Sequence, residues 1–183
     1  DKKTNKNIFY HSKNTISKTM NYYLGGLQEY TPKLMTIHAP NVNSYRRLFA
    51  TWDAPRNTKW GVGNRSCGFR IPSIEEKSMR VENRISGSDT NPYLVVAANL
   101  AAGYLGIEKK IKATEETKKS TFDDKTSSLP KNIDEAISLF EKDDDLRKIF
   151  GQKFIKTISA IRRVEYQAYL KVISSWEREY LLL

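Results

Sequence analysis

The spacing of apolar and polar residues in the 183-residue chain predicts helices at its start. Asn14 has the chemistry of a helix cap, and the apolar residues that follow recur at helical spacing on one face. That face comprises Ile16, Met20, Tyr23, Leu24 and Leu27. Thr31-Pro32 is typical of a helix start, so a short second helix is expected through Ile37. It ends at His38-Ala39-Pro40-Asn41.

Residues Asn43 to Arg47 predict a short helical turn. The next segment is expected to be a loop as far as Pro55, because Asp53-Ala54-Pro55 cannot continue a helix. Residues Trp60 to Ile71 form the first strand-like region, whose glycines allow a close approach of the backbone.

A second strand-like region, Met79 to Ile85, has the most regular alternation in the chain. One face carries Met79, Val81, Asn83 and Ile85, and the other carries Arg80, Glu82 and Arg84. The face that carries Arg80, Glu82 and Arg84 could be a solvated surface with weak ion pairs. The nearby supply of cations, namely Arg65, Arg70 and Lys77, favours a binding face instead. Arg65 and Arg70 are an odd number of residues apart, so a regular strand would point their side chains to opposite faces. Arg65 must therefore precede the strand or lie at a bulge.

The second half of the chain is predicted to be helical around one long loop. Asn91 caps a helix that begins at Pro92, and its run from Tyr93 to Ile107 is apolar on nearly all sides, which predicts a buried central helix. The polar residues Lys112 to Lys131 predict an exposed loop, and Asn132 starts a short helix. From Phe154 to the end, a continuous apolar stripe predicts one helix about 40 Å long.

An acidic run, Glu141 to Asp145, interrupts this half and is typical of a helix end or a first turn. The expected fold class is α+β. A small antiparallel sheet edge carries the charged front, the helix Tyr93 to Ile107 backs it, and the last helix wraps around both. Completing the sheet requires strands from outside this chain.

Composition narrows the function classes. No apolar run is long enough to span a bilayer, and the lone Cys67 excludes a disulfide framework, so a cytoplasmic location is expected. With two histidines and one cysteine an ordinary zinc site is excluded, and His38 is expected to be a hydrogen-bonded structural residue. The net charge of +10 favours anionic partners, although much of it is lysine scattered along the chain. The chain begins without methionine, which favours a fragment or a processed product.

Several sequence blocks together resemble the glutamine synthetase family. They occur in the family's order over nearly the whole chain: Asn43-Ser44-Tyr45-Arg46-Arg47-Leu48, Asn64-Arg65-Ser66 with Arg70, and Arg80-Val81-Glu82-Asn83-Arg84 followed by Asn91-Pro92-Tyr93-Leu94. The residues Trp60-Gly61-Val62 and Ser175-Trp176-Glu177-Arg178 resemble the sequences of the polyamine-glutamylating branch of the family. The resemblance places residues 1–183 in the C-terminal part of a catalytic domain, without its N-terminal domain and upstream metal ligands.

The resemblance implies an ATP-dependent ligase of nitrogen metabolism that forms a γ-glutamyl phosphate, which ammonia or another amine attacks. By position, Arg47 and Arg84 would bind the carboxylate of glutamate and the acyl phosphate. Arg65 would neutralise the phosphoryl group in transfer. Asp53 stands where the family carries a glutamate that closes the site and deprotonates ammonium, and it is one methylene shorter.

The nucleotide side of the site is implied in the same way. Arg70, Lys77 and Arg80 would contact the phosphates and base of ATP, and Glu82 would bind Mg²⁺ or Mn²⁺. Fixed cations and a hard divalent ion are what phosphoryl transfer requires. Glu82 alone cannot hold such an ion, and the family's sites lie between subunits of a homo-oligomeric ring. The isolated chain is therefore expected to be inactive.

Other readings of the sequence stay open. The acceptor of the parent enzyme could be ammonia or a polyamine. A non-catalytic nucleotide-binding or structural relative would keep the same fold. A nucleic-acid-binding domain rests only on the net charge and predicts an affinity that falls steeply with salt. Small-molecule substrates, without nucleic acid or membrane partners, are the expectation.

Overall fold

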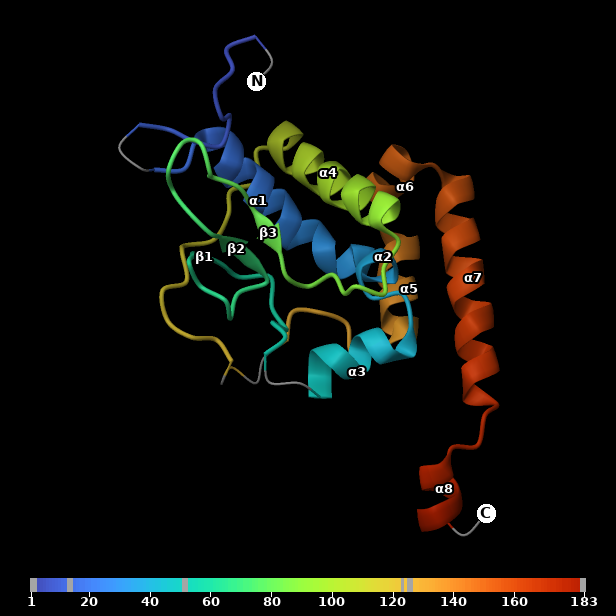
Figure 1. Ribbon diagram of the computed structural model, residues 1–183. Coiled ribbons are helices and arrows are strands. Elements are labelled where there is room, and N and C mark those ends of the chain that lie inside the picture. The colour runs from blue at the N-terminus through green and yellow to red at the C-terminus, as the bar shows by residue number, and fades with distance from the viewer. Residues whose placement is uncertain (1–2, 13–14, 51–52, 123, 125–126, 182–183) are drawn as a thin grey trace.

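The computed structural model describes residues 3–12, 15–50, 53–122, 124 and 127–181. Its helices are α1 (Lys18–Tyr30), α2 (Met35–His38), α3 (Val42–Ala50), α4 (Pro92–Glu108), α5 (Ile133–Lys142), α6 (Asp144–Phe150), α7 (Gln152–Leu170) and α8 (Ser175–Tyr180), with a 3-10 turn at Thr31–Leu34. The strands are β1 (Trp60–Val62), β2 (Phe69–Ile71) and β3 (Glu82–Asn83). Figure 1 shows α1 and α4 side by side, the small sheet next to them and α7 at the far edge. The predicted α+β class is confirmed.

Close contact between α1 and α4 forms the centre of the molecule, and small residues make it possible. A Cβ added at Gly26 would lie 2.1 Å from the carbonyl oxygen of Ala102, and one at Gly106 would lie 2.6 Å from the Cα of Gly26. At Gly103 an added Cβ would overlap the ring of Tyr23. The glycines therefore let the two backbones approach one another, and larger side chains would push the helices apart.

The first helix begins later than the apolar pattern predicts. Ser17 caps α1, and its hydroxyl accepts a hydrogen bond of 3.1 Å from the backbone N–H of Met20. Asn14, the predicted cap, lies outside the described residues. Ile16 precedes the helix and pairs with Tyr10 in an isolated bridge, so its place in the apolar pattern reflects packing beside α1.

Helix α3 is longer than the predicted turn, since it runs from Val42 to Ala50. A loop follows at Asp53, as predicted, and residues 51–52 lie outside the described part of the chain. The apolar side of α3 packs through Leu48, which is fully buried, so tertiary contact extends a helix whose sequence signal is short.

The sheet is mixed, and the prediction of an antiparallel sheet is wrong for its first pair. β1 and β2 are parallel, with Trp60 opposite Phe69, whereas β2 and β3 are antiparallel, with Arg70 opposite Glu82. The first strand-like region is therefore two strands. The six residues 63–68 that separate them are long enough to carry the chain back beside its own start.

The alternation from Met79 to Ile85 predicts the faces correctly, although only Glu82–Asn83 pairs as a strand. Met79 and Ile85 are buried, and Arg80 is exposed. On the inner face the amide of Asn83 donates to the Oδ1 of Asn99 in α4, 2.9 Å away. The predicted support of the charged strand by this helix is thus confirmed.

The polar segment after α4 is a loop, as predicted, but part of it covers the outer edge of β1. The backbone N–H of Thr117 donates to the carbonyl of Trp60 at 2.9 Å, and the indole N–H of Trp60 donates to the carbonyl of Thr114 at 2.8 Å. The carboxylate of Glu116 accepts from the backbone N–H of Val62. These bonds satisfy groups that an uncovered edge strand would present to other chains.

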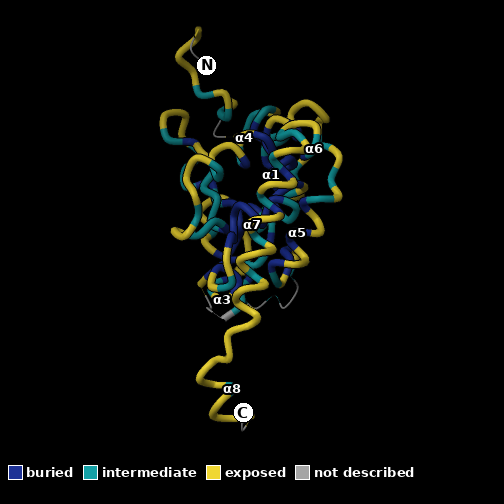
Figure 2. The backbone as a smooth tube through the Cα atoms, turned by 90° about the vertical axis from the view of Figure 1, so that its right-hand side faces the viewer, coloured by how far each residue is buried: buried dark blue, intermediate teal, exposed yellow. Residues whose placement is uncertain are grey.

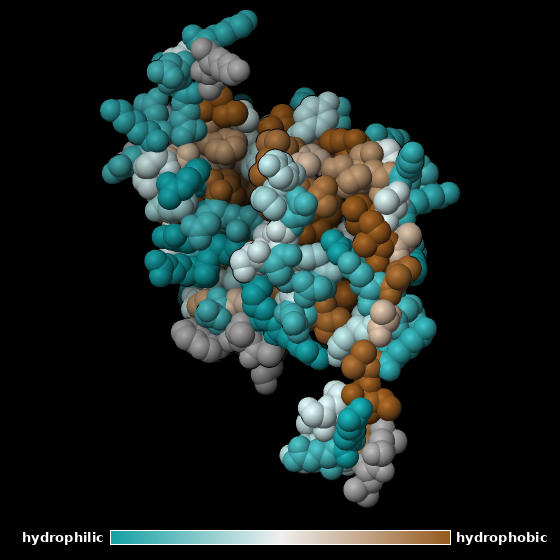
Figure 3. All heavy atoms as spheres, turned by 45° about the vertical axis from the view of Figure 1, so that its right-hand side comes forward, coloured by the Kyte–Doolittle hydropathy of each residue, from teal (hydrophilic) through white to brown (hydrophobic). Residues whose placement is uncertain are grey.

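Helix α4 is not buried on all sides, which corrects the prediction for its apolar run. One face is buried at Ala98, Ala102 and Leu105. The opposite face carries an exposed stripe, called here the α4 stripe: Tyr93, Val96, Leu100, Tyr104 and Ile107. Part of the apolar surface of the molecule is visible in Figure 3. Hydrophobicity on all sides of a helix indicates apolar neighbours on both faces, and the described residues cover only one face of α4.

The C-terminal region is two helices, where one long helix was predicted. α7 ends at Leu170, and Ser174 starts α8 with a capping box that it shares with Glu177. The hydroxyl and carboxylate of this box satisfy backbone groups that a continuous helix would use, so the helix ends before them. α8 extends away from the body and is exposed (Figures 1 and 2).

The acidic run Glu141–Asp145 both ends one helix and starts the next, and α6 was not predicted. Asp143 caps α6, since its carboxylate accepts a 2.8 Å hydrogen bond from the backbone N–H of Leu146. Asp144 and Asp145 then occupy the first turn, where negative charge is favourable.

His38 is fully buried and has the structural role predicted for it. Its Nδ1 lies 2.7 Å from the hydroxyl of Ser86, and its carbonyl accepts from the backbone N–H of Gly87. Burial without a charged partner lowers the pKa of His38 from 6.5 to about 4. The imidazole of His38 is therefore neutral in the folded protein, and in that form it bonds to Ser86 in the segment after β3.

Replacement of Leu100 by Lys should reduce self-association of the chain, because it places a charge in the middle of the α4 stripe. We expect the unaltered chain to show a weight-average mass above that of the monomer in sedimentation equilibrium, and Leu100→Lys to lower it. Leu139→Lys, which alters an exposed leucine on α5, is the matched control. A monomeric unaltered chain, or an equal effect of the control, would contradict this.

Stability should fall as the pH is lowered from 6.5 towards 4. In this window the unfolded chain protonates His38 and the folded chain does not, so protons favour unfolding. From the pKa values given above, the free energy of unfolding should decrease by about 2 kcal/mol between pH 7 and 5 on account of this residue. Urea unfolding measures it. His38→Phe should abolish that part of the pH dependence, whereas His11→Phe should keep it, and an unchanged slope in His38→Phe would refute the assignment.

Candidate phosphate-binding and carboxylate-binding site

Two arginines hold the carboxylate of Glu82 on the outer face of β2 and β3. Arg70 lies directly opposite Glu82 in the register, and its Nη1 is 3.0 Å from Oε2. The Nε of Arg84, two residues along the chain, is 3.4 Å from Oε1. The arginine side chains are about four-fifths buried, at 20% and 22% exposure, so the cluster is more shielded than an ordinary surface ion pair.

These arginines keep hydrogen-bond donors that no group in the described residues accepts. The Nε of Arg70 and the Nη1 of Arg84 are buried and have no hydrogen-bond partner there. A buried charged donor without an acceptor is costly. The arrangement therefore favours an anion at this face over the solvated surface that the sequence left open.

Arg47 reaches the same region from α3. Its Nη2 donates a 2.5 Å hydrogen bond to the carbonyl of Ile85, the residue that follows Arg84. A Cβ added at Gly87 would lie 3.2 Å from the Nε of Arg47, so the guanidinium lies against the backbone there. The fold thus brings Arg47 from an earlier helix to the end of the charged strand.

Arg65 lies in the turn between β1 and β2 and is exposed. It precedes β2, as its parity with Arg70 requires. The backbone N–H of Arg84 donates to the carbonyl of Gly68 at 2.9 Å, which binds the end of this turn to the charged strand. The end of the turn that carries Arg65 is thus joined to the charged strand, although the side chain of Arg65 makes no ion pair or hydrogen bond among the described residues.

Lys77, Arg80 and Asp53 are exposed. The Nη1 of Arg80 donates to the carbonyl of Ser78, two residues before it. Lys77 lies in the preceding turn, and Asp53 begins the segment after α3. Within the described residues, no ion pair or hydrogen bond joins any of the three to Glu82. Their predicted roles stay predictions.

The described residues do not form a metal site. No group of three or more histidine, cysteine, aspartate or glutamate side chains lies close enough to hold an ion in the described part of the chain. Both oxygens of Glu82 are already paired with arginines. Hard divalent cations need several oxygen ligands, so Glu82 could supply one of them and no more.

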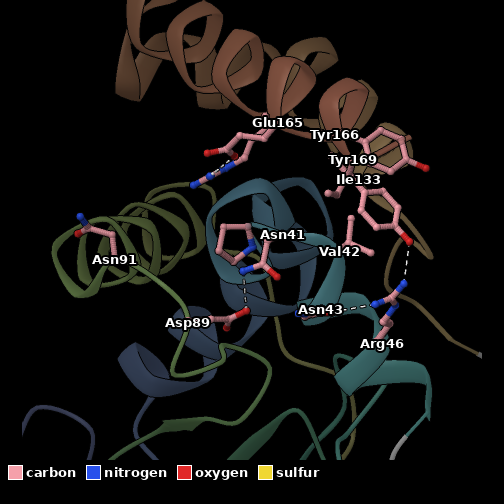
Figure 4. A pocket seen from close by; sticks show the side chains of 12 residues that line it. Asn41, Val42, Asn43, Arg46, Asp89, Asn91, Ile133, Glu165, Tyr166 and Tyr169 are labelled. Atoms are coloured by element: carbon pink, nitrogen blue, oxygen red, sulfur yellow. Dashed lines mark hydrogen bonds and ion pairs between the residues drawn. The ribbon is translucent and has the colours of Figure 1, made fainter. Parts of the chain in front are cut away.

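A groove between α3 and α7 (Figure 4) has a volume of about 590 Å³. Its charged groups are paired with neighbours. Arg46 donates to the hydroxyl of Tyr169 at 2.7 Å and lies over that ring, and Arg162 pairs with Glu165 at 2.7 Å. The carboxylate of Asp89 accepts from a serine hydroxyl at 2.6 Å. These charged side chains therefore all have partners, and Arg70, Glu82 and Arg84 do not line the groove.

A second set of residues at the charged face was not anticipated from the sequence. The side chains of Asn64 and Ser66, on either side of Arg65, are hydrogen-bonded to residues 117–121 of the polar loop. In the sequence, Asn64 and Ser66 stand out only as the neighbours of Arg65 in one of the blocks that resemble the glutamine synthetase family. The loop has no apolar pattern that would indicate a partner, so only the fold reveals this contact.

No helix in the described part of the chain is both long and apolar enough to cross a membrane.

Comparison with known proteins identifies the family. The family model described as the glutamine synthetase catalytic domain matches residues 2–181. The glutamine synthetase of Methanocaldococcus jannaschii is 34% identical over 172 residues, which cover 90% of this chain and 38% of that protein. The γ-glutamylputrescine synthetase PuuA of Escherichia coli is 31% identical over 176 residues, covering 96% of this chain and 37% of that one.

A solved structure agrees with the sequence relatives. A GmaS/ADP complex superimposes with a TM-score of 0.84 at 30% identity, covering 96% of this chain and 42% of the other. The chain thus spans about two-fifths of the length of these proteins. With its arginine-rich sheet edge, its α+β fold and a family match along nearly its whole length, the chain belongs to the glutamine synthetase family.

Proposed function

We propose that this chain is the C-terminal part of the catalytic domain of an ATP-dependent ligase that joins glutamate to ammonia through a γ-glutamyl phosphate. The observation that carries the proposal is the cluster of Arg70, Glu82 and Arg84, in which buried guanidinium nitrogens have no acceptor among the described residues. Phosphate and carboxylate oxygens are the acceptors that arginine binds best, because its planar fork can make paired hydrogen bonds with them.

In this proposal the arginines divide the anionic groups between them. Arg84 and Arg47, which is bonded to the carbonyl of Ile85, bind the carboxylate of glutamate and the acyl phosphate. Arg65 neutralises the phosphoryl group in transfer. Phosphoryl transfer needs positioning and charge neutralisation more than covalent chemistry, so a set of fixed cations suits it.

The remaining residues complete one wall of the site. Lys77 and Arg80, with Arg70, contact the phosphates and base of ATP, and their exposure leaves them accessible. Asp53 accepts a proton from the attacking amine. Glu82 would supply one oxygen ligand to Mg²⁺ or Mn²⁺, and the ion would screen the phosphate charge. The other metal ligands come from outside the described residues, as does the partner subunit in a proposed homo-oligomeric ring.

The acceptor could be an amine other than ammonia. Relatives of this chain include a γ-glutamylputrescine synthetase, a γ-glutamylethanolamide synthetase and a glutamate–isopropylamine ligase, at 31–32% identity, alongside glutamine synthetases. At the position where the family carries a glutamate, this chain has Asp53, whose carboxylate reaches less far.

The isolated chain should have no ligase activity, because one wall of the site cannot hold the metal. We expect no ATP-dependent γ-glutamyl product with glutamate and either ammonia or putrescine, measured by phosphate release and by mass spectrometry. Turnover with either amine would contradict the assignment of a partial site.

Binding of polyphosphate should nevertheless be measurable, because the cations are in place. We expect tripolyphosphate to bind the unaltered chain in isothermal titration calorimetry, and Arg84→Ala to weaken binding about tenfold through the loss of a charge-assisted contact. Arg163→Ala, which removes an exposed arginine of α7 that pairs with Glu141, is the matched control and should change little. Equal weakening in both variants would indicate a nonspecific charge effect and reject the site.

A further inference from the structure

The side chain of Arg65 has no hydrogen bond or ion pair of its own among the described residues. Its guanidinium is therefore placed by the backbone of the turn 63–68 alone. That turn begins at Gly63, whose φ of +65° lies in the left-handed region that glycine favours. Whatever fixes this turn fixes the position from which Arg65 can reach an anion.

The residues on both sides of Arg65 point inward and hold the turn. The Oδ1 of Asn64 accepts from the backbone N–H and from the hydroxyl of Ser66, at 3.0 and 2.7 Å. The amide of Asn64 donates to the carbonyls of Thr117 and Lys119, at 2.8 and 3.0 Å. The turn is thus closed on itself and attached to the polar loop.

Thr121 makes the deepest contact between the loop and the turn. Its backbone N–H donates to the Oγ of Ser66 at 2.8 Å, and its hydroxyl donates to the carbonyl of Ser66 at 2.7 Å. The two side chains are 8% and 2% exposed. The residue after Arg65 is therefore bound through both its side chain and its carbonyl.

Asn57 joins this network from the other side. Its amide donates to the carbonyl of Ser66 and to the Oγ1 of Thr121, both at 3.1 Å, and its Oδ1 accepts from the backbone N–H of Gly68. Asn57 is 7% exposed. Because these groups are buried, the loss of one partner leaves another polar atom unsatisfied, and the network acts as a unit.

We propose that Thr121, through Ser66, is a positioning residue that holds the Arg65 turn in the geometry required to bind a phosphoryl group. The inference rests on the proposed function, since it takes Arg65 as a phosphate-binding cation. It assigns a role in the site to a loop whose composition predicts only exposure. A cation held in place before the anion arrives loses less conformational entropy on binding.

A double-mutant cycle tests this, with tripolyphosphate binding measured by calorimetry on the full chain. We expect Arg65→Ala to weaken binding about tenfold and Thr121→Val, which has nearly the same shape without the hydroxyl, about threefold. In the double variant Thr121→Val should cause no further loss, because it acts only through Arg65. Thr121→Ser should restore binding.

Two controls separate positioning from general loosening. Ser128→Ala removes a hydrogen bond between the same loop and Thr58, away from the turn, and should leave binding unchanged. Circular dichroism verifies that each variant is folded, and Ser66→Ala takes the place of Thr121→Val if the latter does not fold.

Each outcome decides the inference. Absence of binding by the unaltered chain, or no effect of Arg65→Ala, overturns the proposed phosphate role and this inference with it. A loss with Arg65→Ala but none with Thr121→Val overturns the inference alone. Equal threefold losses from Thr121→Val with and without Arg65 would mean that Thr121 acts on the fold in general, which also overturns it.

Discussion

The register between β2 and β3 is the constraint on which the charged face depends. It places Arg70 directly opposite Glu82, and the extended alternation that continues past β3 places Arg84 on the same side as Glu82. A shift by one residue would turn these side chains inward and bring Asn83 and Ile85 out. Burial of Ile85 and the bond from Asn83 to Asn99 in α4 oppose that shift. Packing of the core therefore determines which charged side chains face outward.

Contacts with three other parts of the chain position the arginines near β2 and β3. Arg47 comes from α3 and is bound to the carbonyl of Ile85. His38 holds the segment after β3 through Ser86, and the polar loop holds the turn that carries Arg65. Each contact is a polar group satisfied by a residue far away in sequence. The site is thus assembled by hydrogen bonds at the edges of a core that α1 and α4 provide.

The apolar surface that remains has a related origin. α4 is apolar on both sides, and only one side has a neighbour among the described residues. The charged side chains that line the groove between α3 and α7 are hydrogen-bonded or ion-paired to neighbours (Figure 4). Surfaces of this kind are suited to contact with further protein, in keeping with a chain that spans about two-fifths of its relatives.

The sequence by itself determined the helices that have strong caps, the faces of the strand at Glu82 and the family. Asn91, Asn132 and the alternation around Glu82 act locally, so their signals survive without tertiary context. Tertiary structure alone decided the parallel pairing of β1 with β2 and the attachment of the polar loop to the Arg65 turn. Those features depend on hydrogen bonds between distant residues, for which the sequence has no periodic signal. The break before α8 could be read from Ser174 and Glu177 once the capping box is recognised, but the apolar stripe continues across it and conceals it.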